Sequence, residues 1–347
     1  MFRILFALAL IPALSTWAQE PPPPDRATVY SANDASAVVR YVENIAVSRQ
    51  MTERLVLAVT GQTDLRKAWS ILVKPTDKVG IKVSTAGGRY FSSHKGIVEA
   101  VVNGLELAGV PRSRIIVWDR HSENLAAAGF VQTKGGYQVR GIDPPTGWDP
   151  KAKLAAPVMG KLIWGDLQFR GKPANALKPK NEDDQLTAES YLPLILTKEL
   201  TKIINIATLS DESGCGVAGA VYNMTVPIVD NNRRFTNGPA AYAMSDVYLD
   251  PRVGDKVVLH ILDGLVAQYA GGPEFSPNYA FPHGTIYASK DPLALDATAA
   301  ALLDTWRAEA KLPPLGRLVQ WLKDAQQGGV GIADRDRIDL RPVSTYP

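Results

Sequence analysis

The hydrophobic positions of the chain form short β-branched runs separated by segments of helical periodicity. Residues 79–83 (VGIKV) and 113–119 (SRIIVWD) are apolar runs bounded by turn residues, a pattern typical of buried strands. Between them, residues 95–110 carry apolar side chains at helical spacing, and Ser92 or Ser93 is the expected N-cap of that helix. A strand, a helix and a second strand within about 40 residues predict a βαβ unit with parallel strands and a right-handed crossover.

The same patterning returns in the C-terminal half of the chain. It predicts three further strands and two further helices, at residues 200–208, 255–265, 284–291, 291–310 and 315–326. Asp291 is a favoured N-cap and Pro292 is favoured at the first helical position, so the start of the helix at 291 is well marked. We therefore predict an α/β fold with a mainly parallel sheet flanked by helices.

Two segments have a different texture. Residues 135–195 are rich in Gly, Pro and Lys and hold short alternating pieces such as 161–169 (KLIWGDLQF), which predicts an inserted β-rich excursion. Residues 19–34 begin with a proline-rich stretch and are expected to form an extended leader. Residues 35–347 then form a single α/β domain that carries the insertion.

The first 18 residues have the pattern of a secretory signal. Arg3 precedes an apolar run, residues 4–14, and small residues follow at the expected cleavage point. This run is shorter than the roughly 20 residues of a membrane-spanning helix, although an uncleaved N-terminal anchor is an alternative. The sequence thus predicts a periplasmic or secreted protein with no membrane span after signal cleavage.

Composition narrows the function classes. The chain has 38 Lys and Arg against 35 Asp and Glu, a near-neutral balance without the clustered basic face that nucleic-acid binding needs. Cys215 is the single cysteine, so neither an intramolecular disulfide nor a cysteine-ligated zinc site or iron–sulfur cluster is expected. It lies between two glycines and is expected to be a small buried residue, not a nucleophile. The sequence lacks the signatures of zinc proteases (HExxH), thiol redox proteins (CxxC) and serine hydrolases (GxSxG).

Polar residues follow the predicted strands, and ligands of open α/β sheets bind outside the carboxyl ends of the parallel strands. If these strands are neighbours, one crevice collects cations and carboxylates from all of them. The candidate catalytic residues are Lys82, Asp119, Asp211 and Asp263. The candidate substrate-binding residues are Ser84, His94, Arg120, Glu212, Asn223 and Asp296.

Such a crevice suits more than one chemistry. Asp119, Asp211 and Asp263 could hold a divalent metal, whereas Lys82 and Arg120 could hold an anion beside the helix N-terminus. Perturbed carboxylates could also act as general acid or base. The alternative is that these polar residues merely begin loops.

Five short motifs follow one another in an order that resembles the family catalogued as domain of unknown function 362. They are IKVS (81–84), VWDR (117–120), SDE (210–212), GAVYN (219–223) and DPLALD (291–296), and the last is the most specific. The resemblance covers most of residues 78–305 and implies a fold more than an activity. Where family members have Lys and His in the third motif, this chain has Ser210 and Glu212, and Tyr222 stands where they have Lys before Asn223. Many members also carry a ferredoxin-like segment, which this chain lacks, so no iron–sulfur cluster is expected.

Three functions fit these patterns. The first is an exported enzyme that uses a metal-assisted or acid/base step on a small polar or anionic substrate. The second is a ligand-binding protein without chemistry, and the third is a degenerate family member that serves as a partner subunit. A small-molecule ligand is expected in the first two cases, and nucleic acid in none.

Overall fold

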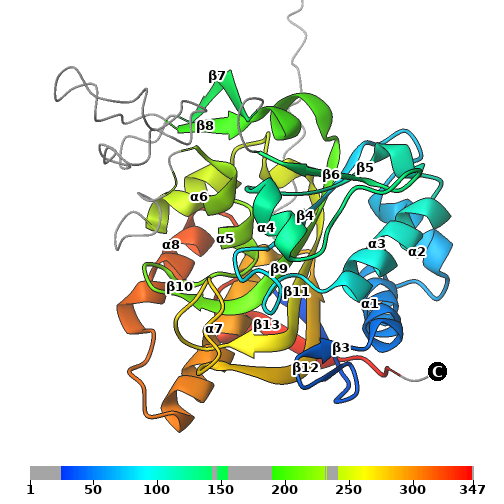
Figure 1. Ribbon diagram of the computed structural model, residues 1–347. Coiled ribbons are helices and arrows are strands. Elements are labelled where there is room, and N and C mark those ends of the chain that lie inside the picture. Colours follow the sequence, from blue (N-terminus) through cyan, green and yellow to red (C-terminus); the bar gives the residue numbers. More distant parts are fainter. Residues whose placement is uncertain (1–24, 143–146, 155–189, 231, 233–240, 346–347) are drawn as a thin grey trace, which may run out of the picture.

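A mixed β-sheet crosses the centre of the molecule (Figure 1). The computed structural model describes residues 25–142, 147–154, 190–230, 232 and 241–345. The strand order is β13-β1-β12-β11-β9-β4-β5-β6, with β10 paired to β9. These strands are β1 (Ala27–Asn33), β4 (Val79–Val83), β5 (Ile115–Asp119), β6 (Gln138–Gly141), β9 (Lys202–Glu212), β10 (Gly216–Val217), β11 (Val257–Gln268), β12 (Ala280–Ser289) and β13 (Ile338–Pro342). The signal predicted at residues 1–18 and the piece at 161–169 lie outside the described residues.

The predicted βαβ unit is confirmed. β4 and β5 run parallel, and the helix α3 (Lys95–Leu107) connects them. All neighbours in the order β11-β9-β4-β5-β6 are parallel, whereas β12 runs antiparallel to both β1 and β11. The chain therefore has an α/β fold with a mainly parallel sheet, and the carboxyl ends of β4, β5, β9 and β11 point the same way.

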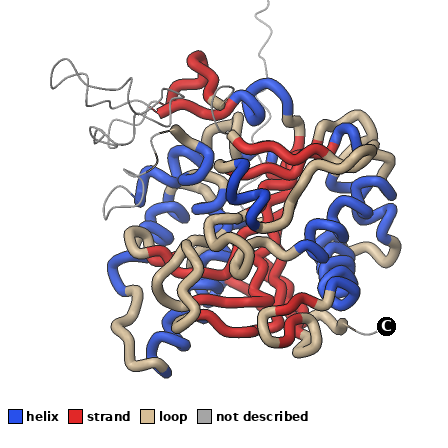
Figure 2. The backbone as a smooth tube through the Cα atoms, viewed as in Figure 1, coloured by secondary structure: helices blue, strands red, loops and turns tan. Residues whose placement is uncertain are grey.

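Helices cover both faces of the sheet (Figure 2). One face packs against α1 (Ile45–Thr60), α2 (Leu65–Leu72) and α3. The other packs against α5 (Ala220–Asn223), α6 (Ala243–Tyr248), α7 (Pro292–Glu309) and α8 (Trp321–Gln327), while α4 (Ser122–Ala127) follows β5. Because side chains alternate along a strand, Ile81 and Val83 of β4 join the core beneath α1 to α3, and Lys82 between them projects toward α5.

The helix starts agree in part with the prediction. Asp291 is the N-cap of α7, where its carboxylate accepts the backbone N–H three residues on at 2.9 Å. The N-cap of α3 is His94, so the expectation of Ser92 or Ser93 was wrong. The hydroxyls of these serines donate to backbone carbonyls elsewhere, which leaves the position to His94.

Two predicted boundaries are corrected by the structure. Residues 27–33, assigned to the leader, form β1, which pairs with β12 and β13 from far along the chain. Residues 138–141, assigned to the insertion, form β6 of the main sheet beside β5. The described remainder of the insertion is a two-stranded antiparallel sheet of β7 (Trp148–Leu154) and β8 (Ser190–Pro193). None of the described helices is long and apolar enough to cross a membrane.

Candidate functional site

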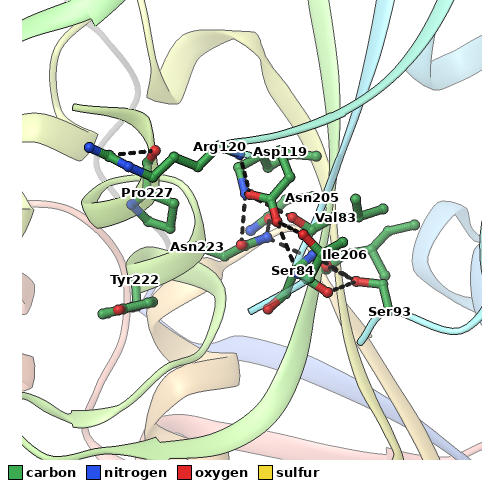
Figure 3. A network of polar contacts seen from close by, with 12 residues as sticks. Val83, Ser84, Ser93, Asp119, Arg120, Asn205, Ile206, Tyr222, Asn223 and Pro227 are labelled. Atoms are coloured by element: carbon green, nitrogen blue, oxygen red, sulfur yellow. Dashed lines mark hydrogen bonds and ion pairs between the residues drawn. The ribbon is translucent and has the colours of Figure 1, made fainter. Parts of the chain in front are cut away.

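Lys82 lies in a buried polar network on the α5 side of the sheet. Figure 3 shows Asp119, Asn205 and Asn223 of this network. The register of β4, β9 and β11 places Lys82, Asn205 and His260 in one row, and all three side chains are buried. The Nζ of Lys82 donates to Oδ1 of Asp119 at 2.7 Å, to the adjacent backbone carbonyl at 2.8 Å and to Oδ1 of Asn223 at 3.0 Å. These three bonds use all three ammonium hydrogens.

Asp119 is equally saturated. Its Oδ2 accepts the backbone N–H of Thr85 at 2.9 Å and the Thr85 hydroxyl, and its Oδ1 accepts the N–H of Arg120 at 2.7 Å. Burial lowers the pKa of Lys82, and the Asp119 carboxylate opposes that effect. The pair joins the ends of β4 and β5 to the loop after β4. We therefore assign Lys82 and Asp119 a structural role in place of the predicted catalytic one.

The network continues through α5 and β9 to β11. Asn223 Nδ2 donates to Oδ1 of Asn205 at 2.8 Å, and Asn205 Nδ2 lies 3.0 Å from Nδ1 of His260. With Asn205 donating to Nδ1, the neutral ring carries its hydrogen on Nε2 and donates to the Tyr248 hydroxyl at 2.9 Å. Burial lowers the pKa of His260 to about 3, so this imidazole stays neutral near pH 7. Hydrogen bonds thus link Lys82 to Tyr248 within the core.

Asp296 anchors α5 instead of lining an opening. Its carboxylate is buried and accepts the backbone N–H groups of Ala220 and Val221 at the start of α5. Burial raises the pKa of Asp296 to about 7, and these two hydrogen bonds act in the opposite direction. Gly219 must be glycine, because a Cβ there would overlap the Asp296 carboxylate. The DPLALD motif therefore positions α5, which carries Asn223.

The polar residues predicted at the ends of β9 and β5 shape the local backbone. Asp211 accepts a backbone N–H of the β11–β12 loop at 2.9 Å, and Glu212 accepts two N–H groups of the turn that follows it at 2.8 Å each. Cys215 in this turn is buried, as predicted, and burial raises the pKa of its thiol. The Arg120 guanidinium donates to backbone carbonyls within residues 227–230.

The three carboxylates predicted to share a metal do not converge. Asp119 bonds to Lys82 on one face of the sheet, whereas Asp263 bonds to residues at the start of α3 on the other. β4 and β9 also lie between β5 and β11, which adds a separation of roughly 14 Å at the usual strand spacing. Among the described residues, no three His, Cys, Asp or Glu side chains are placed to hold a metal ion. The predicted site at Asp119, Asp211 and Asp263 is therefore not formed.

A different arrangement lies where β11 meets the start of α3. Oδ2 of Asp263 accepts the backbone N–H of His94 at 2.7 Å and lies 2.8 Å from its Nδ1, and Oδ1 accepts the N–H of Leu265 at 3.1 Å. The Asp263 side chain is fully buried, while that of His94 is 13% exposed. An Nδ1–H that donates to Asp263 leaves the lone pair of His94 on Nε2. Within the described part of the chain, Nε2 has no hydrogen-bond partner.

His94 lines an open groove of about 480 Å³ at the carboxyl end of β4, together with Tyr41, Val42, Glu43, Arg89, Tyr90 and Lys95. Ser84 lies behind it, with its hydroxyl 3.2 Å from that of Thr208. Arg89 and Lys95 form no ion pair with any described residue. The groove beyond β4 therefore carries two cations that have no ion-pair partner among the described residues.

Glu43 tunes the charge of this groove. Its carboxylate accepts the Ser48 hydroxyl at 2.6 Å and the N–H of Gly96 at 2.9 Å, and burial raises its pKa. Burial of His94 disfavours its charged form, but Asp263 and then Glu43 outweigh that effect, and the pKa of His94 is raised. The neighbouring carboxylates therefore favour the protonated form of the imidazole.

Three charged residues of the groove were missed in the sequence. Arg89 lies in the Gly- and Ser-rich loop between a predicted strand and helix, a position that often binds ligands, and Lys95 opens that helix. Both could have been found by that signal. Glu43 had no signal, because it belongs to a two-residue strand in a segment without clear periodicity.

Comparisons with known proteins match a family model in one part of the chain and indicate no activity. Residues 184–301 match the sequence model of a domain of unknown function, DUF362. A crystal structure of a protein from Thermotoga maritima is similar over 72% of this chain at 11% identity and a TM-score of 0.37, and the chain spans 58% of that protein. No curated protein matches the chain. Residues 184–301 are thus similar to the DUF362 family, which confirms the resemblance seen in the sequence for that segment.

Proposed function

We propose that the chain is an acid/base enzyme in which His94, oriented by Asp263, acts as the general base on a small polar or anionic substrate. The observation that carries the proposal is the Asp263 carboxylate, which binds both the backbone N–H and Nδ1 of His94. A buried carboxylate on one ring nitrogen fixes the tautomer and leaves the other nitrogen free for proton transfer. Arg89 and Lys95 supply charge for an anionic substrate.

The proton transfer follows from this geometry. Nε2 of His94 takes a proton from water or from an acidic substrate C–H or O–H bond, and the electron pair of that bond stays with the oxygen or carbon. Asp263 stabilises the imidazolium that forms, as a carboxylate does behind other catalytic histidines. The hydroxyls of Ser92 and Ser93 already donate to backbone carbonyls, which favours direct base catalysis over a covalent serine intermediate.

The two alternative functions, a binding protein and a partner subunit, predict different results in a turnover assay. A binding protein without chemistry would hold the same ligands in this groove with no turnover. A partner subunit would need another chain for either property. The signal pattern of the first 18 residues supports export to the periplasm or beyond, which N-terminal sequencing of protein secreted by its own host would test.

The test is a turnover screen with small anionic esters, phosphate esters and carbon acids, run on the wild type and on His94→Gln and Asp263→Asn. For any substrate turned over, His94→Gln should lose about 10²- to 10⁴-fold in kcat, the usual contribution of a general base. His121→Gln is the matched control, because His121 precedes α4 and lies outside the groove lining. Full turnover by folded His94→Gln would refute the proposal.

A further inference from the structure

The rim of the groove carries a cluster of exposed apolar side chains. The hairpin of β2 (Val38–Val39) and β3 (Val42–Glu43) leaves Val39 58% and Val42 70% exposed, directly opposite each other. Tyr90, which also lines the groove, is 59% exposed. Single exposed apolar residues are ordinary, whereas several around one groove indicate a binding surface.

Aromatic rings from three separate segments form one wall of this rim. The ring of Phe275, in the β11–β12 loop, stacks on Tyr90 at 5.6 Å between centroids and meets the edge of Tyr41 at 6.3 Å. The hydroxyl of Tyr41 donates to the carbonyl of Ala280 at 2.7 Å, which ties the hairpin to β12. Hydrogen bonding and ring packing therefore fix the position of this wall.

The hairpin turn keeps bulky residues where glycine would be favoured. Arg40 has φ of 49° and Tyr41 has φ of 64°, both in the left-handed region that side chains with a Cβ rarely adopt. Strained positions of this kind persist where the surrounding structure or function requires them. Tyr41 is one of the residues that line the groove, so its retention there is consistent with ligand contact.

The charged residues of the groove indicate the polar part of its ligand. Arg89 and Lys95 line the same groove, and neither has an ion-pair partner among the residues that the structure describes. An acidic head group would supply the missing charge and would lie beside Nε2 of His94. The apolar rim begins next to these cations, because Tyr90 follows Arg89 directly.

We infer that the groove takes a small amphiphilic anion, with its acidic head at Arg89 and Lys95 and its apolar part against Val42, Tyr90 and Phe275. This inference rests on the proposed function for the statement that the ligand is a substrate. Binding can be measured with probes that do not react, so the two can be tested separately.

The probes are butyl, hexyl and octyl phosphate below their micelle concentrations, with octanol and inorganic phosphate, titrated by calorimetry at pH 8.5. Affinity should rise with chain length, by at most about fourfold per methylene if each is fully buried. Octanol should bind at least tenfold more weakly than octyl phosphate. Val42→Ser and Tyr90→Ser should flatten the chain-length dependence, and the double variant Arg89→Ala with Lys95→Ala should abolish the preference for octyl phosphate over octanol.

Matched controls lie on α2 and just after it. Ile71→Ser removes a side chain that is 53% exposed, and Lys74→Ala removes an exposed charge; neither should change binding. The wild type should bind octyl phosphate even if the turnover screen finds no substrate, which separates the two proposals. Equal affinity for inorganic and octyl phosphate would overturn the inference, as would binding to phosphatidylglycerol vesicles with none to the monomeric alkyl phosphates.

Discussion

Replacing Lys82 with methionine should destabilise the protein by about 3–5 kcal/mol, the usual cost of removing one member of a buried ion pair. The Lys82 side chain is completely buried, and methionine fills most of its volume, so the loss is polar and not steric. Asp119 would keep three donors, whereas Asn223 Oδ1 and the carbonyl of Val83 would each lose this donor. A buried acceptor left without a partner costs about 1–3 kcal/mol, so the two acceptors together give about 2–6 kcal/mol, a range that includes this value.

Urea denaturation followed by circular dichroism measures this change as a shift of the midpoint at constant slope. Lys78→Met is the matched control, because Lys78 pairs with Glu199 near the start of the same strand but both side chains are partly exposed. An exposed pair contributes about 0–1 kcal/mol, so this variant should lose little. A loss below 1 kcal/mol for Lys82→Met at an unchanged slope would refute the structural role of the Lys82–Asp119 pair.

Three further predictions concern titration and backbone fit. Burial raises the pKa of Asp296 to about 7, so the folded protein holds the proton of this carboxyl more tightly than the unfolded chain does. The free energy of unfolding should therefore fall by at most about 4 kcal/mol as pH rises from 4 to 7. Denaturation curves across that range measure this slope, and Asp296→Asn should flatten it. His94 should titrate by NMR above its ordinary pKa of 6.5. Its contribution to stability is therefore present below pH 6.5 and is lost as pH rises through the raised pKa. In Asp263→Asn, burial should bring the pKa of His94 below its value in the wild type. Gly219→Ala should lower the melting temperature by several degrees, because its Cβ would displace the Asp296 carboxylate; an unchanged melting temperature would contradict the assigned contact.

The regular elements could be predicted because their signals are local. VGIKV and IIVWD are buried on both faces, so they appear as unbroken apolar runs, and the helix between them shows its own periodicity. Asp291 followed by Pro292 marks a helix start by side-chain chemistry alone. β1 could not be placed in the same way, because it is half-exposed and its partners β12 and β13 lie more than two hundred residues away in the chain.

Residue types at strand ends indicated which side chains carry polar chemistry, and parallel pairing directs the ends of β4, β5, β9 and β11 to one edge of the sheet. The packing of the folded chain decided which of these polar side chains line the groove. Lys82 and Asp119 were both recognised, yet their hydrogen bonding is completed by Thr85 in the loop after β4 and by Asn223 of α5, far along the chain. His94 and Asp263 are 169 residues apart, and only the folded sheet brings the carboxylate to the imidazole. The local sequence pattern therefore determined the helices, the strands and the set of candidate polar residues. Long-range strand pairing and the alternation of side chains between the two sheet faces decided which of these residues line the groove.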